Sequence, residues 1–520
     1  MELEKQILKQ NTLTCRAFTQ ITLDDDCIVK DNKPDVVKII HARGTVSFEE
    51  TKITNQTVWV TGKLRFVVLY RSDDQEGKLE SLEGTVDFGE KIAMEGVEET
   101  DHVRLVGQLT DLAISAINSR KLAIRALVEI TATAERQSEE AIVGAILGEA
   151  DVQQRQEEKE MLLLAALVHD IIRTHNEINL PGSNPNVSRM IYHNVDIRNR
   201  ETVPGKGRVQ LNGEAHIALL YAAEDGQLVW FETMVPFSGT MECAAQEEQS
   251  LCWSCISPAE IVLEAINDYD GEPRTLSLDM TFEVDQKVWN EAKVSVLTDA
   301  YALKKKLNIQ RQRMSAFSLL MKNVAKLRLS EQLSIDEGQE KILQLSSVEG
   351  CIQVDSVEPV DNGLSVEGLL LLHILYTTAD DGCPLSHTSA QVPFSQIIDI
   401  PGLVANGQKV CYEMEPGIDQ LQVNLLDNDR YEVKASISLS TLVLTEEKFE
   451  KIVDVQAEGQ DEELLERQPG LIGYIAQEDE QLWDIAKRYH TTEQEIVETN
   501  GLKVPKLKAG DKILIVKCVG

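Results

Sequence analysis

The chain reads Val58-Trp59-Val60-Thr61-Gly62-Lys63-Leu64-Arg65-Phe66-Val67-Val68-Leu69-Tyr70 in its first long strand-like stretch, with an apolar residue or glycine at every second position. A period of two sustained over this length predicts one long β-strand that buries a single face. The glycine near its centre predicts a β-bulge or a close approach of the neighbouring backbone. This stretch decides the fold class because the chain repeats it.

Two further copies occupy residues 209–221 and 364–376, with Gly213 and Gly368 at the position of Gly62. Each copy is followed by a second shared segment and then by an arginine that precedes another strand. The segments are Val86-Asp87-Phe88-Gly89, Val235-Pro236-Phe237-Ser238 and Val392-Pro393-Phe394-Ser395, and the arginines are Arg120, Arg274 and Arg430. The copies are spaced by about 150 residues, which indicates tandem domains and excludes a short-repeat solenoid.

The repeat predicts a mainly β, multi-domain protein. We expect three β-rich, sandwich-like modules at residues 1–150, 151–305 and 306–455. The joins between them, Ser138 to His175 and Ala302 to Leu329, are rich in helix-forming residues, so helical connections are expected. An acidic linker, residues 456–470, should lead to a small C-terminal domain at residues 471–517.

The C-terminal segment has a different periodicity. The tetrad Tyr474-Ile475-Ala476-Gln477 is strand-like, and Leu482, Ile485, Ala486 and Tyr489 form the apolar stripe of a short helix. Thr492 and Glu495 form a capping box for a second helix, and Asn500-Gly501 predicts its end. A last strand is expected at residues 513–516.

This strand–helix–helix–strand order, with Leu482-Trp483-Asp484-Ile485-Ala486 and Ala509-Gly510-Asp511-Lys512-Ile513, resembles a LysM domain. LysM domains bind glycans that contain N-acetylglucosamine, such as peptidoglycan. The resemblance implies a groove formed by Glu478, Asp479, Glu480, Gln481, Trp483, Leu502, Lys503 and Val504. The family's usual Gly-Asp-Thr is replaced here by Asp479-Glu480-Gln481, and the added negative charge favours a basic protein surface over a neutral glycan. Trp483 is either a partly exposed anchor or a buried lid.

The three modules resemble SPOCS domains. The fit includes the entry segments Cys27 to Val36 and Ile178 to Val187, whereas the third module carries Glu340-Lys341-Ile342 in place of proline. SPOCS modules followed by one LysM domain resemble the SipL family of clostridial spore coat assembly proteins. The resemblance implies docking to the coat morphogenetic ATPase SpoIVA at the forespore surface, in the mother-cell cytoplasm. It also allows other coat proteins as partners of the SPOCS modules, with peptidoglycan as the alternative partner.

The charge balance narrows the partners further. Lys and Arg number 51 against 86 Asp and Glu, a formal net charge of −35. Such a charge repels phosphate backbones and anionic lipid, so nucleic acid is not expected as a partner. The longest apolar run, Met161 to Val168, is too short to span a bilayer, so no membrane insertion is expected. An N-terminus without a signal pattern and nine scattered cysteines favour a reducing cytoplasm.

One sequence pattern could carry reactive groups, namely Cys252-Trp253-Ser254-Cys255. A matching second pair, which a zinc site needs, is absent from the sequence, so we interpret both as ordinary thiols. Phosphate-binding loops and hydrolase motifs are absent as well. The sequence therefore predicts a non-enzymatic adaptor that needs no cofactor or metal.

Overall fold

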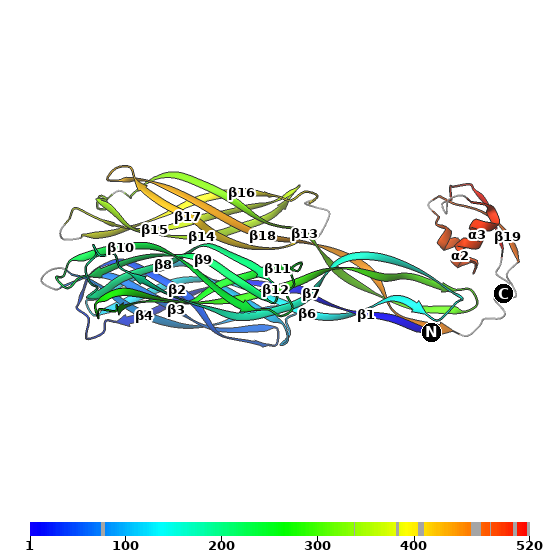
Figure 1. Ribbon diagram of the computed structural model, residues 1–520, viewed down its shortest axis with the longest axis horizontal. Coiled ribbons are helices and arrows are strands. Elements are labelled where there is room, and N and C mark those ends of the chain that lie inside the picture. Colours follow the sequence, from blue (N-terminus) through cyan, green and yellow to red (C-terminus); the bar gives the residue numbers. More distant parts are fainter. Residues whose placement is uncertain are drawn as a thin grey trace.

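The computed structural model describes residues 1–73, 78–336, 338–380, 384–403, 410–458, 470–478, 480–502 and 507–516. Almost all of these residues before position 459 lie in β-strands, which confirms the predicted mainly β class. None of the described helices is long and apolar enough to cross a membrane. The strands form an elongated body from which a narrower extension projects, with the N-terminus at its far end (Figure 1).

Among the described residues before position 459, eighteen strands form three groups of six, which we call modules 1 to 3. Module 1 comprises β1 (Glu2–Ile28), β2 (Val36–Thr54), β3 (Thr57–Ser72), β4 (Leu79–Ala93), β5 (His102–Asn118) and β6 (Lys121–Leu147). Module 2 comprises β7 (Val152–Asn179), β8 (Arg189–Gly205), β9 (Arg208–Ala222), β10 (Leu228–Glu242), β11 (Leu251–Asn267) and β12 (Pro273–Ala302). Module 3 comprises β13 (Lys306–Ser334), β14 (Gln344–Val360), β15 (Gly363–Thr377), β16 (Leu385–Asp399), β17 (Val410–Leu425) and β18 (Arg430–Glu458).

Each module contains two antiparallel three-stranded sheets. In module 1 the strand orders are β1-β6-β5 and β2-β3-β4, and modules 2 and 3 repeat both sheets with their equivalent strands. The repeated sequence stretch forms the central strand of the second sheet, namely β3, β9 and β15. Buried side chains from both sheets form one core in every module, because the alternating strands turn their apolar faces toward each other.

The shared glycines lie opposite the shared phenylalanines. The cross-strand pairs are Gly62–Phe88, Gly213–Phe237 and Gly368–Phe394. A Cβ on Gly62 would lie 2.6 Å from Cζ of Phe88 and 2.5 Å from the carbonyl oxygen of Ser47 on the other neighbouring strand. The close backbone approach predicted from the sequence is therefore confirmed, and the absence of a side chain makes room for an aromatic ring.

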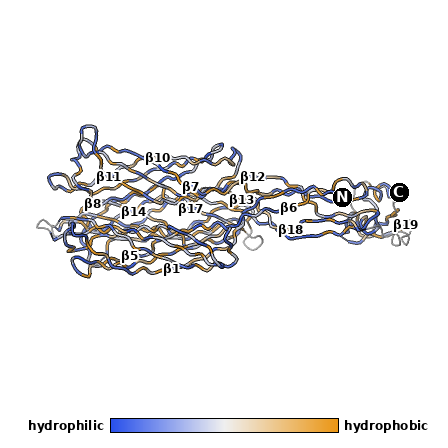
Figure 2. Tube along the Cα trace, turned by 90° about the horizontal axis from the view of Figure 1, so that it is seen from below, coloured by the Kyte–Doolittle hydropathy of each residue, from blue (hydrophilic) through white to orange (hydrophobic). Residues whose placement is uncertain are grey.

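The predicted helical connections are wrong. Residues 138–147 belong to β6, residues 152–175 to β7 and residues 306–329 to β13. These strands pair along their length with β1, β12 and β18, respectively. Hydrophobic and hydrophilic residues alternate along the strands (Figure 2). Cross-strand pairing and burial on one side thus override the helix preference of the Glu, Gln and Leu residues in these segments.

The outer ends of these long strands form a stalk, which we define as residues 2–12, 136–147, 152–163, 290–302, 306–316 and 447–458. Each module contributes one antiparallel pair to it. Its core contains Leu8 and Ile142 of module 1, Met161 and Val294 of module 2, and Met314 of module 3. Three hairpin-like arms therefore share one apolar interior, so none of them buries its apolar face alone.

The modules also meet inside the body through ionic groups. Lys287 of module 2, only 2% exposed, donates to Glu135 of module 1 and to Glu413 of module 3, the latter at 2.7 Å. Burial by itself raises the pKa of the Glu413 carboxyl, and Lys287 opposes that effect. Because a buried charge needs a partner, this network ties the three modules to one another.

The C-terminal domain contains β19 (Leu471–Ile475), α2 (Leu482–Arg488), α3 (Glu493–Asn500) and β20 (Lys512–Val516). Thr492 and Glu495 form the predicted capping box, and Gly501 is the predicted left-handed C-cap at φ 58°. The first strand begins and ends earlier than predicted, since Ala476 and Gln477 follow it. Residues 456–458, which were predicted to begin the linker, belong to β18, and residues 459–469 lie outside the described residues.

Candidate functional site

The predicted groove residues fall into three environments. Glu478 and Gln481 are exposed, Glu480 and Leu502 are half-buried, and Trp483 is buried. Asp479, Lys503 and Val504 lie outside the described residues. The structure thus brings Glu480, Gln481 and Trp483 together at the start of α2, but it does not leave all of them free for a ligand.

Glu480 is engaged within the C-terminal domain. It accepts hydrogen bonds from the Tyr474 hydroxyl at 2.7 and 2.8 Å and lies 3.1 Å from Nη1 of Arg488. It also accepts the backbone N–H of Gln477 at 3.2 Å. The hydrogen bond from Tyr474 holds the pKa of Glu480 below its usual value. Glu480 therefore connects β19 to α2, and its charge is compensated by Arg488.

Trp483 is buried by another part of the chain. Its indole ring meets Tyr301 of β12 edge-to-face, with ring centroids 4.9 Å apart. Its Nε1–H donates to Oδ2 of Asp299 at 2.9 Å. The side chain is 7% exposed, so it is a buried residue, but one that forms a contact between two domains. The sequence left two interpretations of Trp483 open, and neither of them included this partner.

Asp299 is the centre of the contact between the C-terminal domain and the stalk. Besides the indole, its carboxylate accepts Lys487 at 2.6 Å and Arg311 at 2.7 Å. Burial on its own raises the pKa of Asp299, but the hydrogen bonds from Lys487 and Trp483 outweigh it and hold that pKa below its usual value. Asp299 is therefore held ionised between two cations.

Three further hydrogen bonds surround this centre. The Tyr301 hydroxyl donates to the carbonyl oxygen of Thr491 at 2.8 Å, and Nδ1 of His490 lies 3.2 Å from the carbonyl oxygen of Ala302. Arg155 of β7 donates to Oε1 of Gln481 at 2.7 Å. Gln481 and Trp483, which were both predicted to line the groove, thus contact the stalk of module 2. The only sequence signal for this contact is an aspartate and a tyrosine close together at the end of a long strand.

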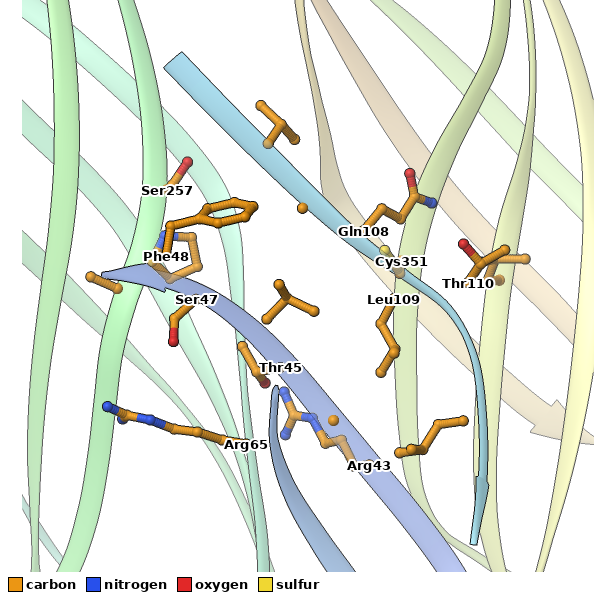
Figure 3. A pocket seen from close by; sticks show the side chains of 18 of the residues that line it. Arg43, Thr45, Ser47, Phe48, Arg65, Gln108, Leu109, Thr110, Ser257 and Cys351 are labelled. Carbon is orange, nitrogen blue, oxygen red and sulfur yellow. The ribbon is translucent and has the colours of Figure 1, made fainter. Parts of the chain in front are cut away.

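A second candidate site is a cavity of about 1290 Å³ between the modules. It is lined by β2 and β5 of module 1, β11 of module 2 and β14 of module 3, and Figure 3 shows apolar Phe48 and Leu109 as well as polar Gln108 and Thr110 among its lining side chains. Its Arg43 is paired with Asn194 of module 2 and Glu349 of module 3. Arg43 of module 1 thus links its module to the other two.

The two cysteines singled out in the sequence are both buried in β11. Burial raises the pKa of the Cys252 thiol to about 11 and also raises that of Cys255. Among the described residues, no group of three or more His, Cys, Asp or Glu side chains could hold a metal ion. Neutral, enclosed thiols are poor nucleophiles and poor metal ligands.

The fold and these contacts define a class: an elongated, mostly β multi-domain protein that carries a small domain of two helices and two strands at its C-terminal end. Comparison with protein families identifies the parts. Residues 35–117, 186–266 and 341–426 match the SPOCS domain of SipL, and residues 474–516 match the LysM domain. The chain therefore belongs to the SipL type of protein, with three SPOCS domains followed by one LysM domain. The comparisons with curated proteins and with solved structures found no match.

Proposed function

We propose that this protein is a non-enzymatic adaptor of spore coat assembly, whose LysM domain docks to the coat morphogenetic ATPase SpoIVA at the forespore surface. The observation that carries the proposal is the succession of three SPOCS domains and one LysM domain, which indicates a sporulation protein. In this proposal the protein works in the mother-cell cytoplasm. Both domain types are of the binding kind, which favours an adaptor over an enzyme.

The geometry of the LysM domain favours a protein partner over a glycan. Trp483, the aromatic side chain of the predicted groove, packs against Tyr301 and has little surface left for a sugar ring. Gln481 is bonded to Arg155. Of the described groove residues, Glu478 keeps an exposed negative charge, and such a charge complements a basic protein surface.

The three SPOCS domains are proposed to act as a rigid arm. Their shared stalk and shared ion network hold them together, so contacts made by one module are fixed relative to those of the others. We propose functional units at residues 1–150, 151–305 and 306–455, with other coat proteins as their partners. Several weak contacts on one rigid arm would add up to firm attachment.

Capture of the full chain by immobilised SpoIVA tests this function. We expect deletion of residues 471–520 to abolish capture and the charge reversal E478K/D479K to weaken it about tenfold, since both act on the docking domain. The matched control is E157K/E158K, which reverses two exposed charges on the stalk. Unchanged capture of the deletion variant would contradict the proposal.

The second candidate is binding of peptidoglycan, which the LysM match to residues 474–516 favours. Sedimentation of the full chain with insoluble peptidoglycan distinguishes the two functions. Sedimentation that depends on residues 471–520, without capture by SpoIVA, would favour the cell-wall function instead.

A further inference from the structure

The outer face of the LysM sheet is mostly aliphatic. Along β19 and β20 the side chains alternate, and Ile472, Tyr474, Ile513 and Ile515 point into the domain core. The side chains on the opposite face are exposed: Leu471 (58%), Ile475 (59%), Leu514 (40%) and Val516 (39%), together with Lys512, which lies across from Ile475 at one end of the face. Gly473 lies among them, and a Cβ built there would meet nothing within 4 Å. The face is thus an apolar surface with an open notch at its centre.

The stalk contact leaves this face free. Trp483 and Lys487 of α2 bind Asp299, and Tyr301 belongs to the cluster formed by the helices and the inner face of the sheet. The helices therefore lie between the stalk and the sheet. In Figure 1 the domain lies at the end of the stalk, with β19 on the side of the helices that faces away from the body.

The two edges of the sheet differ. Asn500 closes the outer edge of β20, since its amide donates to the carbonyl oxygen of Leu514 and accepts the Leu514 N–H, each at 2.7 Å. Thr491 donates to the carbonyl oxygen of Val516 at 3.2 Å. Within the described part of the chain, β19 pairs with β20 alone.

The sequence of β19 does nothing to protect this edge. Leu471-Ile472-Gly473-Tyr474-Ile475 contains no charged residue and no proline, the usual features that keep another strand from pairing. An edge that is open on one side and flanked by an aliphatic face is suited to strand addition.

We propose that the free edge of β19 and the aliphatic face beside it form the protein-docking surface of the LysM domain. The occupant is an extended segment of a partner protein with aliphatic side chains at alternate positions. Its backbone pairs with β19 as a third strand, and its outward side chains extend the apolar face across the notch at Gly473. The inference rests on the proposed function, because it names the surface through which the LysM domain binds a protein.

Lysine substitution on the outer face tests the surface, with SpoIVA as the probe. In the full chain, L471K and I475K should each weaken capture at least about tenfold, because they place a charge in an apolar contact. Both side chains point into solvent, so the fold should be retained, and an unchanged thermal midpoint verifies this. The matched control is M234K, which replaces an exposed side chain (53%) on β10 and should leave capture unchanged.

Hydrogen exchange supplies a second, structural readout. On binding SpoIVA, the amides of residues 471–475 should become protected, while those of residues 480–481 should not. Protection of the groove residues alone would overturn the proposal. Equal protection of residues 471–475 in the free protein and in the complex would also overturn it, because the chain's own residues would then cover the edge.

The remaining outcomes separate this inference from the function on which it rests. If I475K binds normally while deletion of residues 471–520 abolishes capture, the docking surface is wrong and the proposed function stands. If neither variant affects capture, the proposed function fails as well. If light scattering shows that I475K turns a dimer into a monomer without changing capture, a second copy of this chain occupies the face and the proposal is overturned.

Discussion

In each repeated strand the shared glycine lies between two close neighbours. One is a phenylalanine ring, and the other is the backbone of the adjacent strand. At Gly368 a Cβ would lie 2.3 Å from the carbonyl oxygen of Gln353 and 2.8 Å from Cζ of Phe394. The register of β14 shifts beside this position, between Val354 and Ser356, as expected of a bulge. The phenylalanine ring can rotate away from an added methyl group, whereas the carbonyl group of a hydrogen-bonded strand cannot.

We expect G368A to lower the free energy of unfolding by about 1–3 kcal/mol, because the added methyl group must displace the backbone of β14. The measurement is the urea midpoint. The control G182A adds the same methyl group where nothing lies within 4 Å of it. Equal urea midpoints for G368A and the unmodified protein would contradict this prediction, because β14 and β15 could then move apart without loss of stability.

The shared arginines show how the third module differs. Arg120 donates to the carbonyl oxygens of Lys33, Val29 and Lys30, and Arg274 likewise donates to carbonyl oxygens in the entry segment of its module. Arg430 instead donates to Asp427 within its own turn. This difference coincides with the changed entry sequence of module 3.

At the level of elements, the end of β12 and helix α2 together place the LysM domain. The Asp299 carboxylate accepts bonds from Trp483 and Lys487 of this domain and from Arg311 of β13. The pKa of Asp299 is lowered, so the ion pairing contributes above the ordinary carboxyl pKa and is lost as the pH falls through the lowered value. The contact should therefore be fully formed near neutral pH.

We expect D299N to weaken the contact by about 1–2 kcal/mol, since the amide keeps the shape but loses the charge and solvent screens part of the effect. Hydrogen exchange at residues 300–302 and in α2 should become faster by about tenfold. The control D399N neutralises an exposed aspartate of β16. Unchanged hydrogen exchange in D299N would mean that the packing of Tyr301 on Trp483 is enough to hold the domain against the stalk.

At the level of the whole molecule, one buried lysine connects all three modules. Removing its charge would leave Glu135 and Glu413 close together without the ammonium group that both of them bind. We expect K287M to destabilise the protein by about 3–5 kcal/mol, because breaking a buried pair leaves uncompensated charge. The control K293M removes an exposed lysine of the same strand, which is paired with Glu160, and should leave the stability nearly unchanged because exposed pairs contribute little. Adding E413Q to K287M should restore part of the loss, and no rescue would contradict the electrostatic explanation.

The junction of the modules also contains neutral histidines. Burial, together with the nearby His387, His373 and Arg43, lowers the pKa of His41 to about 3. Because the folded-state pKa lies below the usual histidine value, the stability is complete at neutral pH and falls as the pH drops below about 6.5.

We expect stability to fall by about 1.4 kcal/mol per pH unit for each such histidine between pH 6 and pH 5, measured by urea unfolding. H41Q should lower this dependence of stability on pH by about 1.4 kcal/mol per pH unit, which is the contribution of one proton. H175Q should not reduce it, because a hydrogen bond to Asp279 raises the pKa of the exposed His175. An identical slope for H41Q would show that His41 is not buried in its neutral form.

The sequence by itself determined what depends on local pattern. Period-two alternation predicted the long strands and the repeat, the glycine predicted the close strand approach, and the capping box and Gly501 fixed the limits of α3. These features could be predicted because each one follows from residues within a few positions of one another.

The tertiary structure alone decided what depends on distant partners. Residues 138–147, 152–175 and 306–329 have helix-forming compositions, and they are strands because β1, β12 and β18 pair with them. Trp483 is buried because the end of β12, far away in sequence, supplies Asp299 and Tyr301. The edge of β19 that no described strand pairs with is likewise defined only by which strands lie beside it. Side-chain pattern reports which face of an element is apolar, and only the packed chain decides what covers that face.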